Sequence, residues 1–144
     1  YCEAIVNEAL RTFMTNTFGI AHRAMQDTKL CGYDIPKDTM IVPMFTEALN
    51  DPNVYKKPDG FHPENFLDES GNLKIPEKHV PFGLGKRRCA GEALAKSNLF
   101  LMCTTLVQNF YFEVPLGHDL PSDEPEEGAT ASVHDYEALI ILRN

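Results

Sequence analysis

The irregular stretch from Asp51 to Arg88 restricts the fold more than any other feature, because it leads directly into the most apolar segment of the chain. Residues that interrupt regular structure recur along the stretch, namely Pro52, Pro58, Pro63, Pro76, Pro81, Gly60, Gly71, Gly83 and Gly85. Loops this long inside a compact domain are functional or disordered. The aromatic residues Tyr55, Phe61, Phe66 and Phe82 favour a packed, ordered loop. We therefore expect a functional loop held on a helical framework.

Helices are expected on either side of this loop. Tyr1 to Met14 and Ala90 to Asn109 both carry apolar residues at helical spacing. The second segment is apolar over a broad surface, so we expect it to be a long core helix. Pro43 to Leu49 is predicted as a short helix that ends before the next proline.

Short strands are predicted elsewhere. Ile20 to Leu30 has moderate strand character, and Gly32 to Val42 is expected to form a β-hairpin that turns at residues 35–38. Tyr111 to Val114 and Tyr136 to Leu142 are expected to form a C-terminal β-hairpin. The predicted fold class is mainly α with small β-sheets (α+β). Residues 1–144 show no repeat and no second domain.

Charge is unevenly distributed in a chain whose net charge is −8. Glu113 to Gly128 holds six acidic residues and no Lys or Arg, whereas Lys78 to Lys96 is mainly basic. An acidic chain is a poor general nucleic-acid binder. A local basic patch instead fits a bound anionic group or an acidic partner. No apolar run approaches the length of a membrane span.

The segment from Phe82 to Gly91 carries the strongest chemical signal. Four cysteines are spaced far apart without a Cys-x-x-Cys pair, which argues against a zinc ribbon. Cys89, however, stands at the start of the apolar helix beside several cations, a setting that favours the thiolate form. The glycines before it allow the backbone to approach a flat group closely. Arg87 can hold an anionic edge of that group. Haem with a cysteine axial ligand meets these conditions.

This segment resembles the haem-thiolate signature of the cytochrome P-450 family, Phe-x-x-Gly-x-Arg-x-Cys-x-Gly. Every fixed position matches, at Phe82, Gly85, Arg87, Cys89 and Gly91. Glu8 to Arg11 resembles the Glu-x-x-Arg motif of the family's helix K. Residues 61–66 resemble the Phe-x-Pro-Glu-Arg-Phe segment that leads into its meander loop. The resemblance covers the whole chain but only the C-terminal third of a typical member: helix, β-hairpin, meander and Cys-loop, long helix and C-terminal hairpin.

The resemblance implies haem b as the cofactor. Cys89 would be the axial ligand of the haem iron. Arg87 and His22 would contact the haem propionates, whereas Phe82 and Gly83 would lie against the haem.

The resemblance also implies structural and substrate-binding roles. Glu8 and Arg11 would form a buried ion pair that locks the meander under the haem. Asn65 departs from the family, in which many members have Arg and others have His at this position. The Glu–Arg pair would then lack its cationic third member, since Asn can supply hydrogen bonds but no charge. The expected substrate-pocket residues are Phe18, Gly19, Ile20, Ala21, Ala129 and Thr130.

The implied activity is a monooxygenase that inserts one oxygen atom of O₂ into an apolar organic substrate, with electrons from NADPH through a reductase. The closest resemblance is to animal microsomal members, which implies the cytoplasmic face of the endoplasmic reticulum membrane and an N-terminal anchor upstream. The family's helix I, with its oxygen-activating acidic-Thr pair, would also lie upstream. The reductase is expected to dock near Lys78, Lys86, Arg88 and Lys96.

Two alternatives remain open at the level of sequence. The chain can be a truncated or degenerate haem-binding protein without monooxygenase turnover. It can also be a hydrolase in which Cys89 is paired with His79 or His118, although that interpretation leaves Arg87 and the glycines without a role.

Overall fold

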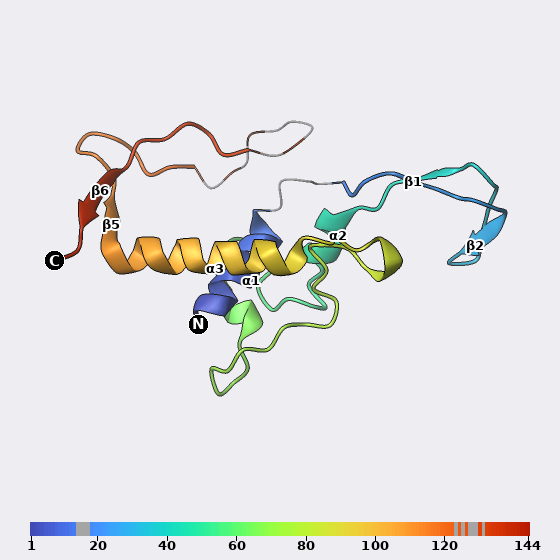
Figure 1. The fold of residues 1–144 in the computed structure, drawn as a ribbon, viewed down its shortest axis with the longest axis horizontal. Coiled ribbons are helices and arrows are strands. Elements are labelled where there is room, and N and C mark those ends of the chain that lie inside the picture. The colour runs from blue at the N-terminus through green and yellow to red at the C-terminus, as the bar shows by residue number, and fades with distance from the viewer. Residues whose placement is uncertain (14–17, 123, 125, 127–129, 131) are drawn as a thin grey trace.

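The computed structural model describes residues 1–13, 18–122, 124, 126, 130 and 132–144, and these form three α-helices and three small antiparallel sheets (Figure 1). The elements in order are α1 (Cys2–Thr12), β1 (His22–Arg23), β2 (Thr28–Leu30), β3 (Tyr33–Ile35), β4 (Met40–Ile41), α2 (Phe45–Leu49), the 3₁₀ turns η1 (Pro63–Phe66) and η2 (Gly85–Arg87), α3 (Glu92–Asn109), β5 (Phe110–Glu113) and β6 (Leu139–Leu142). The expected α+β class is confirmed.

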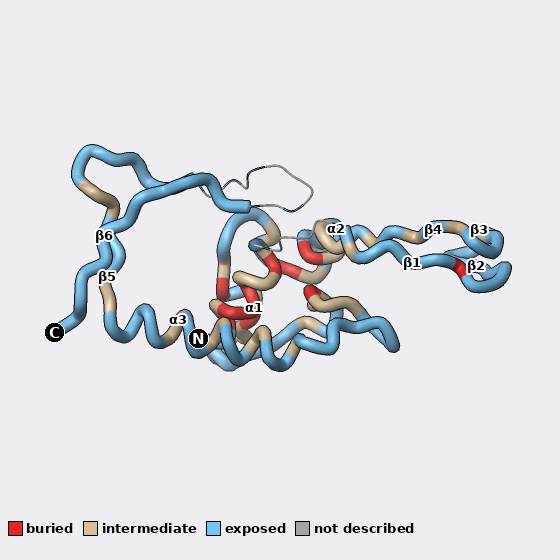
Figure 2. The backbone as a smooth tube through the Cα atoms, turned by 45° about the horizontal axis from the view of Figure 1, so that its top comes forward, coloured by how far each residue is buried: buried red, intermediate tan, exposed pale blue. Residues whose placement is uncertain are grey.

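The buried part of the molecule gathers around α1 and the long loop (Figure 2). Ala4 of α1 packs with Tyr55 and Phe66 of the loop, and these three residues are at most 1% exposed. The prediction of an ordered loop is therefore confirmed, because its aromatic side chains supply much of the core. Phe61 lies outside this cluster and stacks on Phe13 at a ring distance of 5.6 Å.

The expected hairpin over residues 32–42 is wrong. β3 pairs backward with β2, in register Leu30↔Tyr33, and β4 pairs with β1 rather than with β3. The tight turn is at Cys31–Gly32, where both residues have positive φ (49° and 87°). Two successive residues in this conformation form the kind of two-residue turn that matches strand twist. Residues 36–39 instead connect the two small sheets.

The expectation that α3 is a core helix is also wrong for this chain, because none of its residues is buried. Leu94, Leu101 and Met102 are 60–67% exposed. The apolar residues surround the helix, whereas α1 is the main helix packed against it (Figure 1). Within the described residues no helix is long and apolar enough to cross a membrane.

The C-terminal hairpin forms as expected in its pairing. β5 and β6 are antiparallel, with Phe110 opposite Leu142 and Glu113 opposite Leu139. They pack at the end of α3 that is far from the Cys89 loop, while the sheet of β2 and β3 lies toward the opposite end of the molecule (Figure 1).

Candidate haem-thiolate site

Backbone hydrogen bonds shape the loop that presents Cys89. The amide of Gly83 donates to the Val80 carbonyl at 3.0 Å, and the amide of Cys89 donates to the Phe82 carbonyl at 2.9 Å. Gly83 and Gly85 have φ values of +77° and +68°. Side chains other than glycine adopt this conformation only at a cost, so the two glycines are what allow the loop to fold back on itself.

Cys89 is a free, exposed cysteine just before α3. The helix begins at Glu92 with Gly91 as its N-cap, two residues later than the sequence indicates. A Cβ atom at Gly91 would lie 3.8 Å from the Cys89 Sγ, so glycine leaves the space beside the sulfur free. The thiol is therefore accessible to an incoming ligand.

The other residues expected to bind the cofactor are spread over two elements. Arg87 ends η2 and is exposed, and its side chain has no hydrogen bond or ion pair with the described residues. His22 is exposed in β1, opposite Ile41. Phe82 and Gly83 are half-buried, and a Cβ atom at Gly83 would meet the Phe45 ring at 3.7 Å.

These residues fit a haem group in their chemistry. No three His, Cys, Asp or Glu residues in the described part of the chain cluster to hold a free metal ion. Haem-thiolate binding requires one accessible cysteine sulfur, and Cys89 supplies it. The exposed Arg87 guanidinium is available for a carboxylate, and Gly85 has nothing within 4 Å of its Cβ position. The Cys89 loop thus offers an open surface with a thiol and a cation.

The fully buried ion pair of Glu8 and Arg11 lies at the centre of the core. Two parallel bonds join them, from Arg11 Nε to Glu8 Oε2 at 2.9 Å and from Nη2 to Oε1 at 2.8 Å. The guanidinium also donates to the carbonyls of Leu49, Pro58 and Gly60 at 2.7–3.1 Å. One arginine therefore fastens α1 to the end of α2 and to the long loop.

Asn65 joins the same network through neutral hydrogen bonds. Its Nδ2 donates to Glu8 Oε1 at 3.3 Å and to the Lys57 carbonyl at 2.7 Å, while its Oδ1 accepts from the Lys57 amide at 2.9 Å. The His62 amide donates to Glu8 Oε1 at 2.6 Å. The Glu8 carboxylate therefore accepts hydrogen bonds from Arg11, His62 and Asn65, and Arg11 is its only cationic donor among the described residues.

Tyr55 and His79 form a second polar contact in the core. The Tyr55 hydroxyl and His79 Nδ1 are 3.0 Å apart. Burial raises the pKa of Tyr55 to about 12, although the Arg11 charge opposes this. Burial, aided by Lys96, lowers the pKa of His79 to about 4. His79 is therefore neutral at ordinary pH, and its Nδ1 atom is paired with the Tyr55 hydroxyl. Cys89 has no hydrogen bond to a histidine in the described part of the chain, which argues against the hydrolase alternative.

The basic residues expected at a docking face are partly neutralised. Glu92 accepts from Lys96 Nζ at 2.8 Å and lies 3.4 Å from Arg88 Nε. The hydrogen bond from Lys96 lowers the pKa of Glu92, with the Arg88 charge contributing. Lys96 also lies 5.9 Å above the Phe82 ring. Lys78 and Lys86 are exposed in the same stretch of chain.

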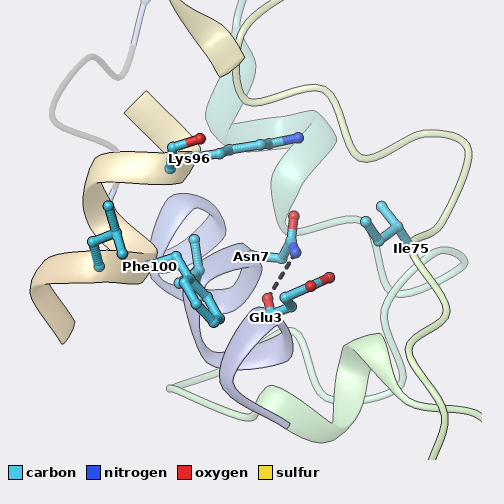
Figure 3. Close-up of a pocket in the computed structure, with 8 residues that line it drawn as sticks. Glu3, Asn7, Ile75, Lys96 and Phe100 are labelled. Carbon is cyan, nitrogen blue, oxygen red and sulfur yellow. Dashed lines mark hydrogen bonds between the residues drawn. The ribbon is translucent and has the colours of Figure 1, made fainter. Parts of the chain in front are cut away.

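A groove of about 470 Å³ lies between α1, α3 and the loop, and none of the residues expected to bind haem lines it (Figure 3). Phe100 and Ile75 line it together with Asn7, whose Nδ2 donates to the Glu3 carbonyl at 2.7 Å. The Asn7 Oδ1 is buried and has no partner among the described residues. A buried acceptor of this kind costs free energy unless a donor reaches it.

Among the described residues expected to line the substrate pocket, Phe18, Ile20 and Ala21 are exposed, whereas Gly19 is half-buried. Phe18 bridges to Met44, and the Gly19 amide donates to the Pro43 carbonyl at 2.8 Å. Ile20 is 83% exposed. Thr130 is exposed, and Ala129 lies outside the described residues. Residues 18–21 form a continuous segment between α1 and β1.

Sequence reasoning missed several partners in the core. The backbone acceptors of Arg11 carry no sequence signal, since any residue has a carbonyl. The sequence indicates Tyr55 only as an aromatic residue of the loop and His79 only as a possible partner of Cys89. The close spacing of His79 to the Phe82–Gly91 motif was the one available signal.

Comparison with known proteins shows which family the chain is similar to. The family model described as Cytochrome P-450 matches residues 1–140. The chain is 47% identical to "Probable cytochrome P-450 303a1" of Drosophila melanogaster and 41% identical to "Farnesoate epoxidase" of Bombyx mori, over 99% of its own length. It is 40% identical to "Cytochrome P-450 2U1" of Rattus norvegicus. It spans 27–29% of the length of these relatives. The chain therefore belongs to the cytochrome P-450 family.

Proposed function

We propose that residues 1–144 are the C-terminal haem-binding part of a single monooxygenase domain, which inserts one oxygen atom of O₂ into an apolar organic substrate. The observation that carries this proposal is the exposed Cys89 thiol on a glycine-shaped loop that also holds the exposed Arg87. Two observations support the larger domain. The exposed apolar side chains of α3 favour a covering structure, and the buried Asn7 Oδ1 has no donor among the described residues.

Each residue of the site has a definite task in this proposal. Cys89 binds the iron of haem b as a thiolate, and Arg87 with His22 holds the propionates by charge and hydrogen bonding. Phe82 and Gly83 lie against the haem. Haem bound to a thiolate supplies the activation of O₂ and cleavage of the O–O bond.

The remaining residues of the proposal fix the site and admit the substrate. Glu8, Arg11 and Asn65 hold the long loop in the shape that presents Cys89. The segment Phe18 to Ala21, with residues 129–130, forms part of the substrate wall.

Electrons are proposed to come from NADPH through a reductase that docks on the basic surface around Cys89. Lys78, Lys86, Arg88 and Lys96 supply its charge, although Glu92 offsets two of them. An acidic partner would be steered to such a surface at low ionic strength. We propose the cytoplasmic face of the endoplasmic reticulum membrane as its location, on the basis of the resemblance to animal microsomal members.

The test is the carbon-monoxide difference spectrum of the reduced full-length polypeptide that carries this chain. We expect a strongly red-shifted Soret band that the Cys89→Ala variant loses and the Cys31→Ala variant keeps, since Cys31 is exposed but outside the loop. Haem without the shifted band in the unaltered protein would contradict thiolate binding. A normal band without oxidation of any apolar substrate would favour the haem-binding protein without turnover.

A further inference from the structure

The Tyr55–His79 pair, in which Tyr55 is buried and His79 is half-buried, is a titratable contact that the proposed reaction does not use. We propose that this hydrogen bond positions the Cys89 loop and that protonation of His79 weakens the hold of Cys89 on haem iron, so that thiolate binding is lost in acid. This inference rests on the proposed function. It makes His79 a positioning residue, since it acts on Cys89 through the loop.

One end of the pair is fixed by the core. Tyr55 is 1% exposed, and the Arg11 guanidinium lies 5.3 Å from the centre of its ring. Arg11 is itself held by the Glu8 carboxylate. The Tyr55 hydroxyl is therefore presented from a rigid, fully buried position.

The other end is held by ring packing as well as by the hydrogen bond. The His79 ring stands edge-on to the Phe66 ring at 4.7 Å and to the Tyr55 ring at 6.3 Å. Its backbone amide donates to the Pro76 carbonyl at 2.9 Å. His79 thus has one defined place, on the aromatic cluster of the core.

The peptide bond to Val80 and two backbone hydrogen bonds connect His79 to Cys89. Val80 follows His79 directly, and its carbonyl accepts the Gly83 amide. The carbonyl of Phe82, within that turn, accepts the Cys89 amide at 2.9 Å. Movement of His79 would therefore disturb the turn that fixes the position of Cys89.

The charges around His79 determine the direction of the effect. Lys96 of α3 and Arg11 of α1 oppose its protonation, whereas Glu8 and Glu92 favour it. Burial is the larger cause and also opposes the charge, so the pKa of His79 lies at about 4. A protonated imidazole gains free energy by leaving this place for water, and the turn that follows it is then released.

The test measures the red-shifted carbon-monoxide band of the reduced full-length holoprotein against pH. In the unaltered protein we expect the band to decline as pH falls from about 6.5 towards 4. The His79→Asn variant keeps an oxygen near the Nδ1 position to accept from Tyr55 but cannot be protonated there. We expect its decline at least one pH unit lower. His118→Gln, an exposed histidine, is the matched control and should follow the unaltered protein.

A second pair of variants separates positioning from folding. Tyr55→Phe removes the hydroxyl and should reduce the band at pH 7.5, because His79 loses its partner. The double variant Tyr55→Phe/His79→Phe replaces the contact with ring packing and should restore the band without the acid decline. This double variant also tests the inference if His79→Asn folds poorly.

The outcomes distinguish this inference from the proposed function. Equal acid midpoints in the unaltered, His79→Asn and double-variant proteins would overturn the inference while leaving haem-thiolate binding intact. Absence of the red-shifted band in the unaltered protein at every pH would instead overturn the proposed function.

Discussion

Removing Arg11 is expected to be the most damaging single change in the described core. The Arg11→Met variant leaves the Glu8 carboxylate buried and uncompensated, because both side chains are 0% exposed. Breaking one partner of a buried ion pair costs about 3–5 kcal/mol. The Leu49 carbonyl, whose hydrogen bond is also buried, loses its donor and adds about 1 kcal/mol. We expect a loss of about 4–6 kcal/mol, comparable with the whole stability of many domains.

The assay is urea unfolding of the full-length polypeptide followed by far-ultraviolet circular dichroism. The double variant Glu8→Met/Arg11→Met removes both charges and should unfold at a higher urea concentration than Arg11→Met alone, because no unpaired charge remains. Lys29→Met breaks a surface ion pair whose side chains are 72% and 82% exposed and should leave the midpoint unchanged.

Two results would refute this reasoning. Arg11→Met could unfold at the same urea concentration as Lys29→Met, which would mean that the buried pair contributes no more than a surface pair. The double variant could unfold as early as Arg11→Met, which would mean that the cost does not arise from the unpaired Glu8 charge.

Three further predictions concern the backbone and the buried tyrosine. Gly83→Ala should cost about 1–2 kcal/mol in urea unfolding, because φ is +77°, and Gly83→Asn should cost less; equal costs would contradict the backbone explanation. Gly19→Ala should cost about 1–3 kcal/mol, because its Cβ would lie 2.5 Å from Pro43 Cγ; an unchanged urea midpoint would contradict this. The pKa of Tyr55 is about 12 in the fold against 10 when unfolded, so its stabilising effect is full below pH 10 and is lost as pH rises through 12. Urea midpoints that fall equally over this range in the unaltered and Tyr55→Phe proteins would contradict that sign.

Local sequence signals predicted the helices well. The apolar spacing that indicated a helix at residues 1–14 corresponds to α1 at Cys2–Thr12, and the segment 90–109 corresponds to α3 at Glu92–Asn109. Both follow from hydrogen bonds between residues close in the chain.

Strand pairing was harder to predict, because each strand has more than one possible partner and the local sequence does not decide between them. A turn forms within the predicted residues 35–38, where the Thr39 amide donates to the Pro36 carbonyl, yet the hairpin closes at Cys31–Gly32, where a non-glycine residue adopts positive φ. Sequence propensity gives Cys31 little reason to adopt that conformation. The pairing of β2 with β3 requires it, because Leu30 and Tyr33 pair on either side of the turn.

By itself, the sequence determined the family, the helices and the order of the motifs, including the glycines and the cysteine of the Cys89 loop. These are properties of neighbouring residues, and they hold wherever the segment folds. Only the tertiary structure decided that Arg11 binds carbonyls 38–49 residues away. It also decided that Asn65 donates a hydrogen bond to Glu8 and that His79 contacts Tyr55 rather than Cys89. Burial and long-range contacts exist only after the chain has closed, and no local pattern records them.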